Sequence, residues 1–230
     1  MIKIEKTDVY GWEAAIRGMR NPMNSWDRID SDFVYDCEMC GSNCGEYASC
    51  TGVCVHIGYN DIDLMKRLAN AGSVHAKYRR MITVTCDVTA PLYWWKEFDT
   101  YKVGTVANSC STMHKIHAKE FTLDDFSHDH MWGECEDRNI DEPIGILNIV
   151  IDALNTYRAQ FLAYGGKDDW WQMIQLLPSS YNQKRTVQLN YEVLVGIYRD
   201  RKNHKLDEWR NFCDWIAALP YSEIITGVCS

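Results

Sequence analysis

The sequence lacks a long apolar run and a recognisable export signal. No hydrophobic stretch approaches the ~18 residues of a membrane-spanning helix, and residues 1–7 contain no apolar core of signal-peptide length. Internal repeats and low-complexity linkers are also absent. We therefore expect a cytoplasmic protein that does not associate with a membrane.

Positive charge is scarce as well. The chain has 24 Lys and Arg residues against 32 Asp and Glu, which gives a net charge of −8 and a pI near 5.3. Proteins that bind the phosphate backbone of DNA or RNA present a basic face, so this balance argues against a nucleic-acid partner. A small anionic ligand stays compatible with it, because a few well-placed Arg or Lys residues are enough to bind one.

The 230 residues have the composition of a globular protein. Hydrophobic residues make up 46% of the chain, and the aromatic residues are spread over most of its length. A chain of this size and balance can bury one sizeable core. We predict a single domain over residues 1–230.

Cysteine is the one residue type that is concentrated locally. With ten cysteines and no export signal, thiols or metal ligands are favoured over disulfides. Half of the cysteines fall in a Cys-rich insertion at about 36–56, namely Cys37, Cys40, Cys44, Cys50 and Cys54. Such thiolates can hold Zn²⁺ or an iron–sulfur cluster, although their spacing matches neither a zinc ribbon nor a ferredoxin motif. A metal site and a loop of reduced thiols are both open.

Hydrophobic periodicity predicts more helix than strand. Apolar residues recur at three- and four-residue steps over 144–164, which is the clearest predicted helix. Further helices are predicted at 60–72, with Asn60 as N-cap, and at 168–176, 190–201 and 206–218. Residues 81–88 alternate as in a half-buried strand, and Ala90-Pro91 then leads into a helix through Phe98. These elements predict an α+β fold.

One motif in the C-terminal part of the chain has a distinctive spacing. Leu177-Pro178 precedes an extended piece at 185–189, Asn190 opens a predicted helix, Arg201 ends it, and His204 follows. Upstream, Ala90-Pro91 follows a strand and precedes a helix. This order resembles the flavin-dependent thymidylate synthase family over roughly residues 60–213, and the C-terminal motif is its specific part.

The resemblance carries expectations about fold and activity. It implies a mixed sheet with long helices, assembled as a homotetramer. It also implies FAD as the cofactor, and dUMP, methylenetetrahydrofolate and NADPH as partners, in a reductive methylation of dUMP at C5. The family's chemistry needs no cysteine nucleophile.

The resemblance also implies roles for individual residues. Arg201 would be catalytic, because a fixed cation beside the pyrimidine favours its N3-deprotonated form. Substrate would be bound by Ser111, Lys102, Asn108 and Arg201, and cofactor by Asn190, His204, Tyr101 and Lys102. Without the resemblance, Arg201 is typical of a solvated helix end, Asn190 of a helix N-cap and Ser111 of a tight turn.

Several of the family's ligand-binding positions hold other residues here. They are Thr100, Met113, Ile174, Glu192 and Gly196, where the family has arginines or other polar residues. Arginines bind the family's anionic ligands, so their loss leaves a second interpretation open. In it the chain is a diverged nucleotide-binding protein of the same fold, without thymidylate synthase activity or acting on another pyrimidine nucleotide.

Overall fold

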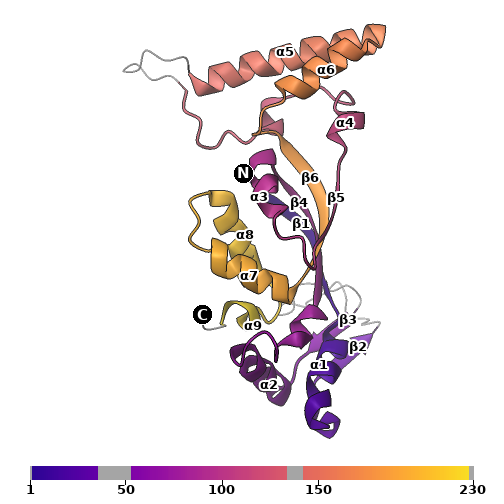
Figure 1. Ribbon diagram of the computed structural model, residues 1–230, viewed down its shortest axis with the longest axis vertical. Helices are drawn as coiled ribbons and strands as arrows, with labels where there is room; N and C mark the ends of the chain where they lie inside the picture. Colours follow the sequence, from indigo (N-terminus) through magenta and orange to yellow (C-terminus); the bar gives the residue numbers. More distant parts are fainter. Residues whose placement is uncertain (1, 36–52, 134–141, 228–230) are drawn as a thin grey trace. The chain divides into compact units, whose positions relative to one another are not determined.

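The computed structural model describes residues 2–35, 53–133 and 142–227 of the chain, which forms two compact units (Figure 1). Each unit is assembled from three separate stretches. Unit 1 consists of Met1–Lys3, Val88–Thr100 and Asn108–Arg185. Unit 2 consists of Ile4–Asp87, Tyr101–Ala107 and Thr186–Ser230. The helices and strands confirm a mixed fold, whereas a single domain over the whole chain stays a prediction.

A sheet with the strand order β1-β4-β6-β5 is built from strands that each have residues in both units. The strands are β1 (Lys3–Tyr10), β4 (Thr83–Pro91), β5 (Val106–Ser109) and β6 (Asn182–Asn190). Every second residue of β4 is buried from Val84 to Ala90, so the predicted half-buried strand is confirmed. It begins two residues later than predicted and continues through Pro91.

The first helix of unit 2 depends on a glycine. Gly11 has φ +92°, and a Cβ placed on it would lie 2.1 Å from the carbonyl oxygen of Met81. Only glycine fits this position, which turns the chain from β1 into α1 (Trp12–Arg20). Trp12, Ile16 and Met19 form the buried stripe of α1. The short 3₁₀ helices η1 (Asn21–Met23) and η2 (Trp26–Arg28) follow directly.

The strands β2 (Asp32–Tyr35) and β3 (Val53–His56) pair antiparallel. Residues 36–52, which lie between them in the sequence, are not described. The helix α2 (Tyr59–Asn70) comes next and is followed by η3 (Lys77–Arg80). The predicted N-cap of α2 was wrong: Gly58 is the cap position, and Asn60 lies in the first turn. The distant Asp30 side chain accepts the backbone N–H groups of Asn60 and Asp61 instead, at 2.8 and 3.1 Å.

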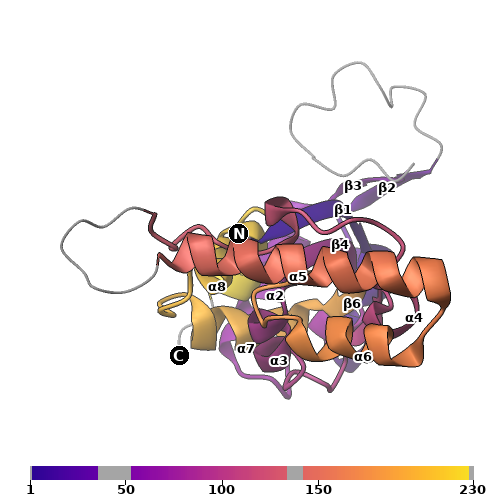
Figure 2. The same ribbon diagram turned by 90° about the horizontal axis from the view of Figure 1, so that it is seen from above.

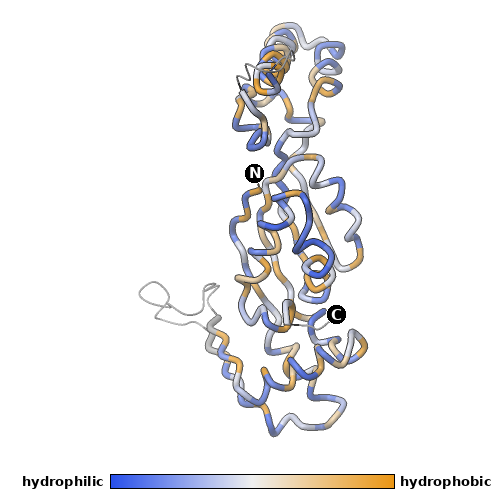
Figure 3. The backbone as a smooth tube through the Cα atoms, turned by 90° about the vertical axis from the view of Figure 1, so that its left-hand side faces the viewer, coloured by the Kyte–Doolittle hydropathy of each residue, from blue (hydrophilic) through white to orange (hydrophobic). Residues whose placement is uncertain are grey.

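Three helices complete unit 2: α7 (Tyr191–Arg201), α8 (Asp207–Ala217) and α9 (Glu223–Thr226). The predicted helices at 190–201 and 206–218 are thus confirmed, with each end within one residue of its prediction. α7 contacts α8, α9 and η3, and its buried residues are Tyr191, Leu194 and Ile197. Figure 3 shows hydrophilic and hydrophobic colours interspersed along the backbone.

Unit 1 is dominated by two helices that pack together, α5 (Pro143–Tyr164) and α6 (Lys167–Leu176) (Figures 1 and 2). Both predicted helices are confirmed. Their core includes Leu147, Leu154 and Met173 together with Phe121 and Phe126. The remaining helices are α3 (Leu92–Phe98), α4 (Thr112–Lys115) and η4 (Leu123–Asp125).

α3 supplies a second buried group of unit 1. Trp94 and Trp95 are 0% and 1% exposed, and their rings contact each other and Phe98. The Trp95 indole N–H donates to the carbonyl oxygen of Gln183 at 2.9 Å, which satisfies its polar atom inside the core. These tryptophans are therefore core residues.

Candidate functional site

The side chain of Arg201, the last residue of α7, contacts two aromatic rings. Its Nε donates a 2.8 Å hydrogen bond to the hydroxyl of Tyr101. Its guanidinium carbon lies 4.6 Å from the ring centroid of Trp209 on α8 and 5.6 Å from that of Tyr101. A cation over aromatic faces is attracted to them, so the two rings fix where this positive charge stands.

His204 joins the same cluster from the turn after α7. Its ring lies 6.4 Å from that of Trp209 in an edge-on arrangement. Its Nδ1 accepts a hydrogen bond from the backbone N–H of Leu206 at 3.2 Å, which assigns the ring proton of the neutral form to Nε2. Tyr101, Arg201, His204 and Trp209 thus form one cluster, which we call the Arg201 cluster.

Asn190 lies at the opposite end of α7 and caps it. Its side-chain oxygen accepts the backbone N–H of Val193 at 3.0 Å, as the N-cap interpretation of the sequence predicted. Gly104 packs directly on the same side chain, since a Cβ on Gly104 would lie 2.9 Å from Nδ2 of Asn190. The loop from Tyr101 to Gly104 therefore contacts both ends of α7.

Lys102 is exposed in that loop. It makes no ion pair with an acidic side chain in the part of the chain that the structure describes. A lysine in this state is available to bind an anion as a point charge.

Two predicted substrate-binding residues belong to unit 1. Ser111 is the N-cap of α4, where its hydroxyl accepts the backbone N–H of His114 at 2.9 Å. Asn108 is exposed on β5. The other predicted residues, Tyr101, Lys102, Asn190, Arg201 and His204, all belong to unit 2. Ligand binding by either set stays a prediction.

A buried ion pair lies at one of the positions where the sequence departs from the family. Nη2 of Arg79 is 2.8 Å from Oε2 of Glu192, with the two side chains 2% and 20% exposed. Nη1 of Arg79 also donates to the carbonyl oxygen of Ile224 at 3.2 Å. The sequence carried no signal for this pair, because its members are far apart in the chain and follow no motif.

Cys213 lies close to the Arg201 cluster on α8. The pKa of its thiol is raised to about 11, first by burial and then by the charge of Asp214, while Arg201 acts in the opposite direction. The thiol is therefore protonated near neutral pH, which makes it a poor nucleophile.

The predicted metal ligands cannot be placed. Cys37, Cys40, Cys44 and Cys50 lie outside the described residues, and Cys54 is placed only as part of the backbone of β3. Over residues 2–35, 53–133 and 142–227, no group of His, Cys, Asp and Glu side chains could hold a metal ion. No helix within those ranges is both long and apolar enough to cross a membrane.

Comparison with known proteins gives a likeness at the level of the fold. No protein-family model matches the sequence, and no curated protein matches it. Two crystal structures of the flavin-dependent thymidylate synthase ThyX from Helicobacter pylori, both with FAD and dUMP, are similar to the chain at a TM-score of 0.63 and 12% identity. The matches cover 97% and 98% of this chain and 97% of the ThyX chain in each case. The predicted ThyX-like fold is thereby confirmed.

Proposed function

We propose that this protein is a thymidylate synthase-like enzyme that methylates dUMP reductively at C5. The observation that carries the proposal is the oriented cation of Arg201 in a fold that resembles ThyX. Substrate recognition by Ser111, Asn108, Lys102 and Arg201 is part of the proposal, as are methylenetetrahydrofolate, NADPH and a cytoplasmic homotetramer.

Arg201 has the properties that the proposed reaction needs. Negative charge develops on the uracil ring when its N3 proton is lost, and a cation fixed beside the ring stabilises that charge without reorganising. Tyr101 and Trp209 hold the guanidinium in one orientation before substrate arrives. A lysine at this position would lack both the planar fork and the stacking on Trp209.

The residues around α7 also fit a flavin dinucleotide. The Nδ2 group of Asn190 is a donor that the cap does not use, because the cap engages only the side-chain oxygen. Lys102 supplies an unpaired cation for a phosphate, and His204 and Tyr101 supply rings. When bound, the flavin would supply the hydride of the reaction. The chain's own contribution would be to bind and orient the cofactor.

A second candidate function is nucleotide binding without turnover. Two acceptor atoms of the candidate site favour it, because they are already hydrogen-bonded within the protein. Oδ1 of Asn190 and Nδ1 of His204 both accept backbone N–H groups. Glu192 adds a carboxylate that pairs with Arg79 and binds no anion. A protein with these residues in its site could keep affinity for a nucleotide and lose the methylation of dUMP.

The test is to add FAD, dUMP, methylenetetrahydrofolate and NADPH to the purified protein and to follow dTMP by mass spectrometry. Flavin absorbance that survives desalting and dTMP formation that is lost in Arg201→Ala are expected. Arg199→Ala is the matched control, because Arg199 is exposed on the same helix and pairs with Asp200. Stabilisation by dUMP without dTMP would select the second candidate. No response to FAD or dUMP would overturn both.

A further inference from the structure

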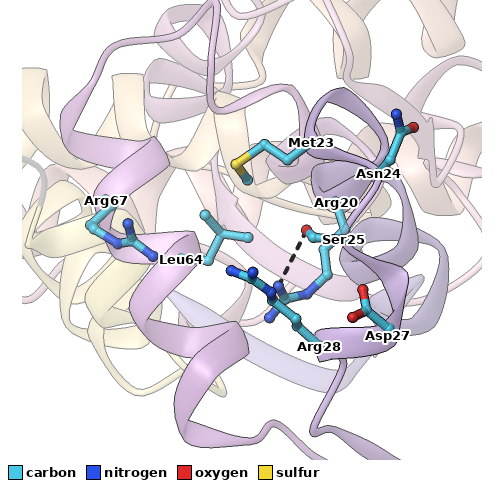
Figure 4. A pocket seen from close by; sticks show the side chains of 8 residues that line it. All are labelled: Arg20, Met23, Asn24, Ser25, Asp27, Arg28, Leu64 and Arg67. Carbon is cyan, nitrogen blue, oxygen red and sulfur yellow. Dashed lines mark hydrogen bonds between the residues drawn. The ribbon is translucent and has the colours of Figure 1, made fainter.

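A cavity of about 350 Å³ lies in unit 2 and is lined by side chains of α1, η1, η2, α2 and the link between η1 and η2 (Figure 4). No residue of the Arg201 cluster lines it. Its volume falls in the range of small-molecule sites. Three guanidinium groups line it: Arg20 ends α1, Arg28 ends η2, and Arg67 lies on α2. The lining thus holds three guanidinium groups and one carboxylate, that of Asp27.

Arg20 is the fixed member of the three. It is 3% exposed, and its Nε and Nη2 lie 2.7 and 2.6 Å from Oδ1 of the fully buried Asp61. Oδ2 of Asp61 accepts the hydroxyl of Ser31 at 2.6 Å and the backbone N–H of Asp30 at 3.1 Å. Asp61 thereby neutralises Arg20 and locks its orientation from one side.

The remaining edge of Arg20 faces Ser25. Nη1 lies 3.5 Å from the hydroxyl oxygen of Ser25, which is drawn as the dashed line in Figure 4. This distance is at the outer limit of a hydrogen bond, so both groups keep capacity to donate to an oxygen atom placed between them. Ser25 is itself 8% exposed, which makes the pair a buried wall of the cavity.

Arg28 and Arg67 carry positive charges that acidic side chains neutralise weakly or not at all. Arg28 has no acidic partner among the residues that the structure describes. Arg67 pairs with Asp63 at 2.9 Å, but both side chains are at least half exposed, so the pair is weak. In Figure 4 the two arginines reach toward each other from opposite walls with Leu64 between them. Asp27 also lines the cavity, with its carboxylate on the side away from Leu64.

We infer that this cavity binds a phosphate group carried by a small molecule, whose apolar part contacts Leu64 and Met23. Guanidinium groups match phosphate oxygens in a fork of two parallel hydrogen bonds, and three of them approach this cavity from three elements. Ser25 adds a hydroxyl donor. Leu64 and Met23 are the apolar side chains of the lining, so a phosphate monoester with an apolar substituent fits better than free phosphate.

Isothermal titration calorimetry of the full chain with inorganic phosphate and with phenyl phosphate tests this inference. Both probes are expected to bind, phenyl phosphate the tighter, and Arg28→Gln is expected to weaken both about tenfold, the cost of one charge-assisted contact. Arg17→Gln is the matched control, because Arg17 is exposed on α1 and does not line the cavity. Arg67→Gln serves as the second variant should Arg28→Gln misfold by circular dichroism.

The outcomes separate this site from the proposed activity. Wild-type affinity for phenyl phosphate in Arg201→Ala is expected, whatever that variant does to dUMP. Absence of binding at millimolar probe, or equal weakening by Arg17→Gln and Arg28→Gln, would overturn the site. Equal affinity for the two probes would overturn the role of Leu64 and Met23.

Discussion

Tyr101 and Arg201 are joined by a 2.8 Å hydrogen bond although 100 residues separate them in the sequence. The bond ties the loop that precedes β5 to the last residue of α7. Because Tyr101 is polar only at its hydroxyl, the same side chain offers Arg201 both an acceptor and a ring face. Orientation and stacking can therefore be separated experimentally.

Tyr101→Phe removes the acceptor and keeps the ring. We expect the free energy of unfolding to fall by about 1 kcal/mol, the usual net worth of one hydrogen bond. We expect turnover, if the proposed activity is present, to fall more than dUMP affinity, because the cation loses its orientation. Urea unfolding and steady-state kinetics measure the two effects. Tyr198→Phe removes the same hydroxyl from a tyrosine of α7 and should alter neither quantity.

Gly104→Ala tests the packing of the loop on Asn190. The alanine would adopt φ +77° and place its Cβ 2.9 Å from Nδ2 of Asn190. The left-handed backbone alone costs about 1 kcal/mol, and the contact adds to it. Gly165→Ala is the control, since Gly165 has φ +68° with nothing within 4 Å of the added Cβ. Equal losses in the two variants would show that the contact with Asn190 contributes nothing.

Glu192→Ala leaves Arg79 buried without its carboxylate. We expect a loss of about 2 kcal/mol or more in the free energy of unfolding, because an uncompensated buried charge is costly. Asp200→Ala removes the carboxylate of an exposed pair with Arg199, with side chains 63% and 45% exposed, and should cost less than about 1 kcal/mol. Denaturant titration compares the two, and a small effect of Glu192→Ala would contradict the burial of the pair.

Alkaline pH should destabilise the fold through Cys86. Burial, together with the neighbouring charge of Asp87, raises the pKa of its thiol from 9.0 to about 12. A raised folded-state pKa gives stability that is complete below pH 9 and is lost as pH rises toward 12. Between pH 8 and 10 the loss should be roughly 1 kcal/mol. Cys86→Ala should make this slope shallower, with Cys213 responsible for part of what is left, whereas Cys110→Ala, at an exposed thiol, should leave it unchanged.

Helices and strands whose buried face follows from the spacing of their own apolar residues could be predicted from the sequence. The helix α5 carries apolar residues at helical spacing and stops at Gly165, and β4 alternates from Thr83 to Ala90. Asn190 was recognisable as an N-cap because capping is a local interaction. The strand β1 was not recognisable, since Val9 is its only fully buried residue and its remaining residues show no alternation.

Features that depend on distant partners could not be predicted. The start of α2 is stabilised by Asp30 from a preceding loop, and the motif at Asn60 pointed to the wrong cap. The pairing of Arg79 with Glu192 and the contact of Tyr101 with Arg201 are likewise set by tertiary packing. Family spacing selected Arg201 and Tyr101 as site residues, but only the structure shows that they touch.

The way in which the chain is divided between the units bears on how the protein is made. Unit 2 begins near the N-terminus and is completed only by Thr186–Ser230, whereas unit 1 needs nothing beyond Arg185. During synthesis on the ribosome, all of unit 1 can therefore be present before α7, α8 and α9 are made. Until then α1 and α2 lack these helices of their own unit. Their apolar faces are exposed throughout that interval, so a chain truncated after β6 should aggregate or recruit chaperones.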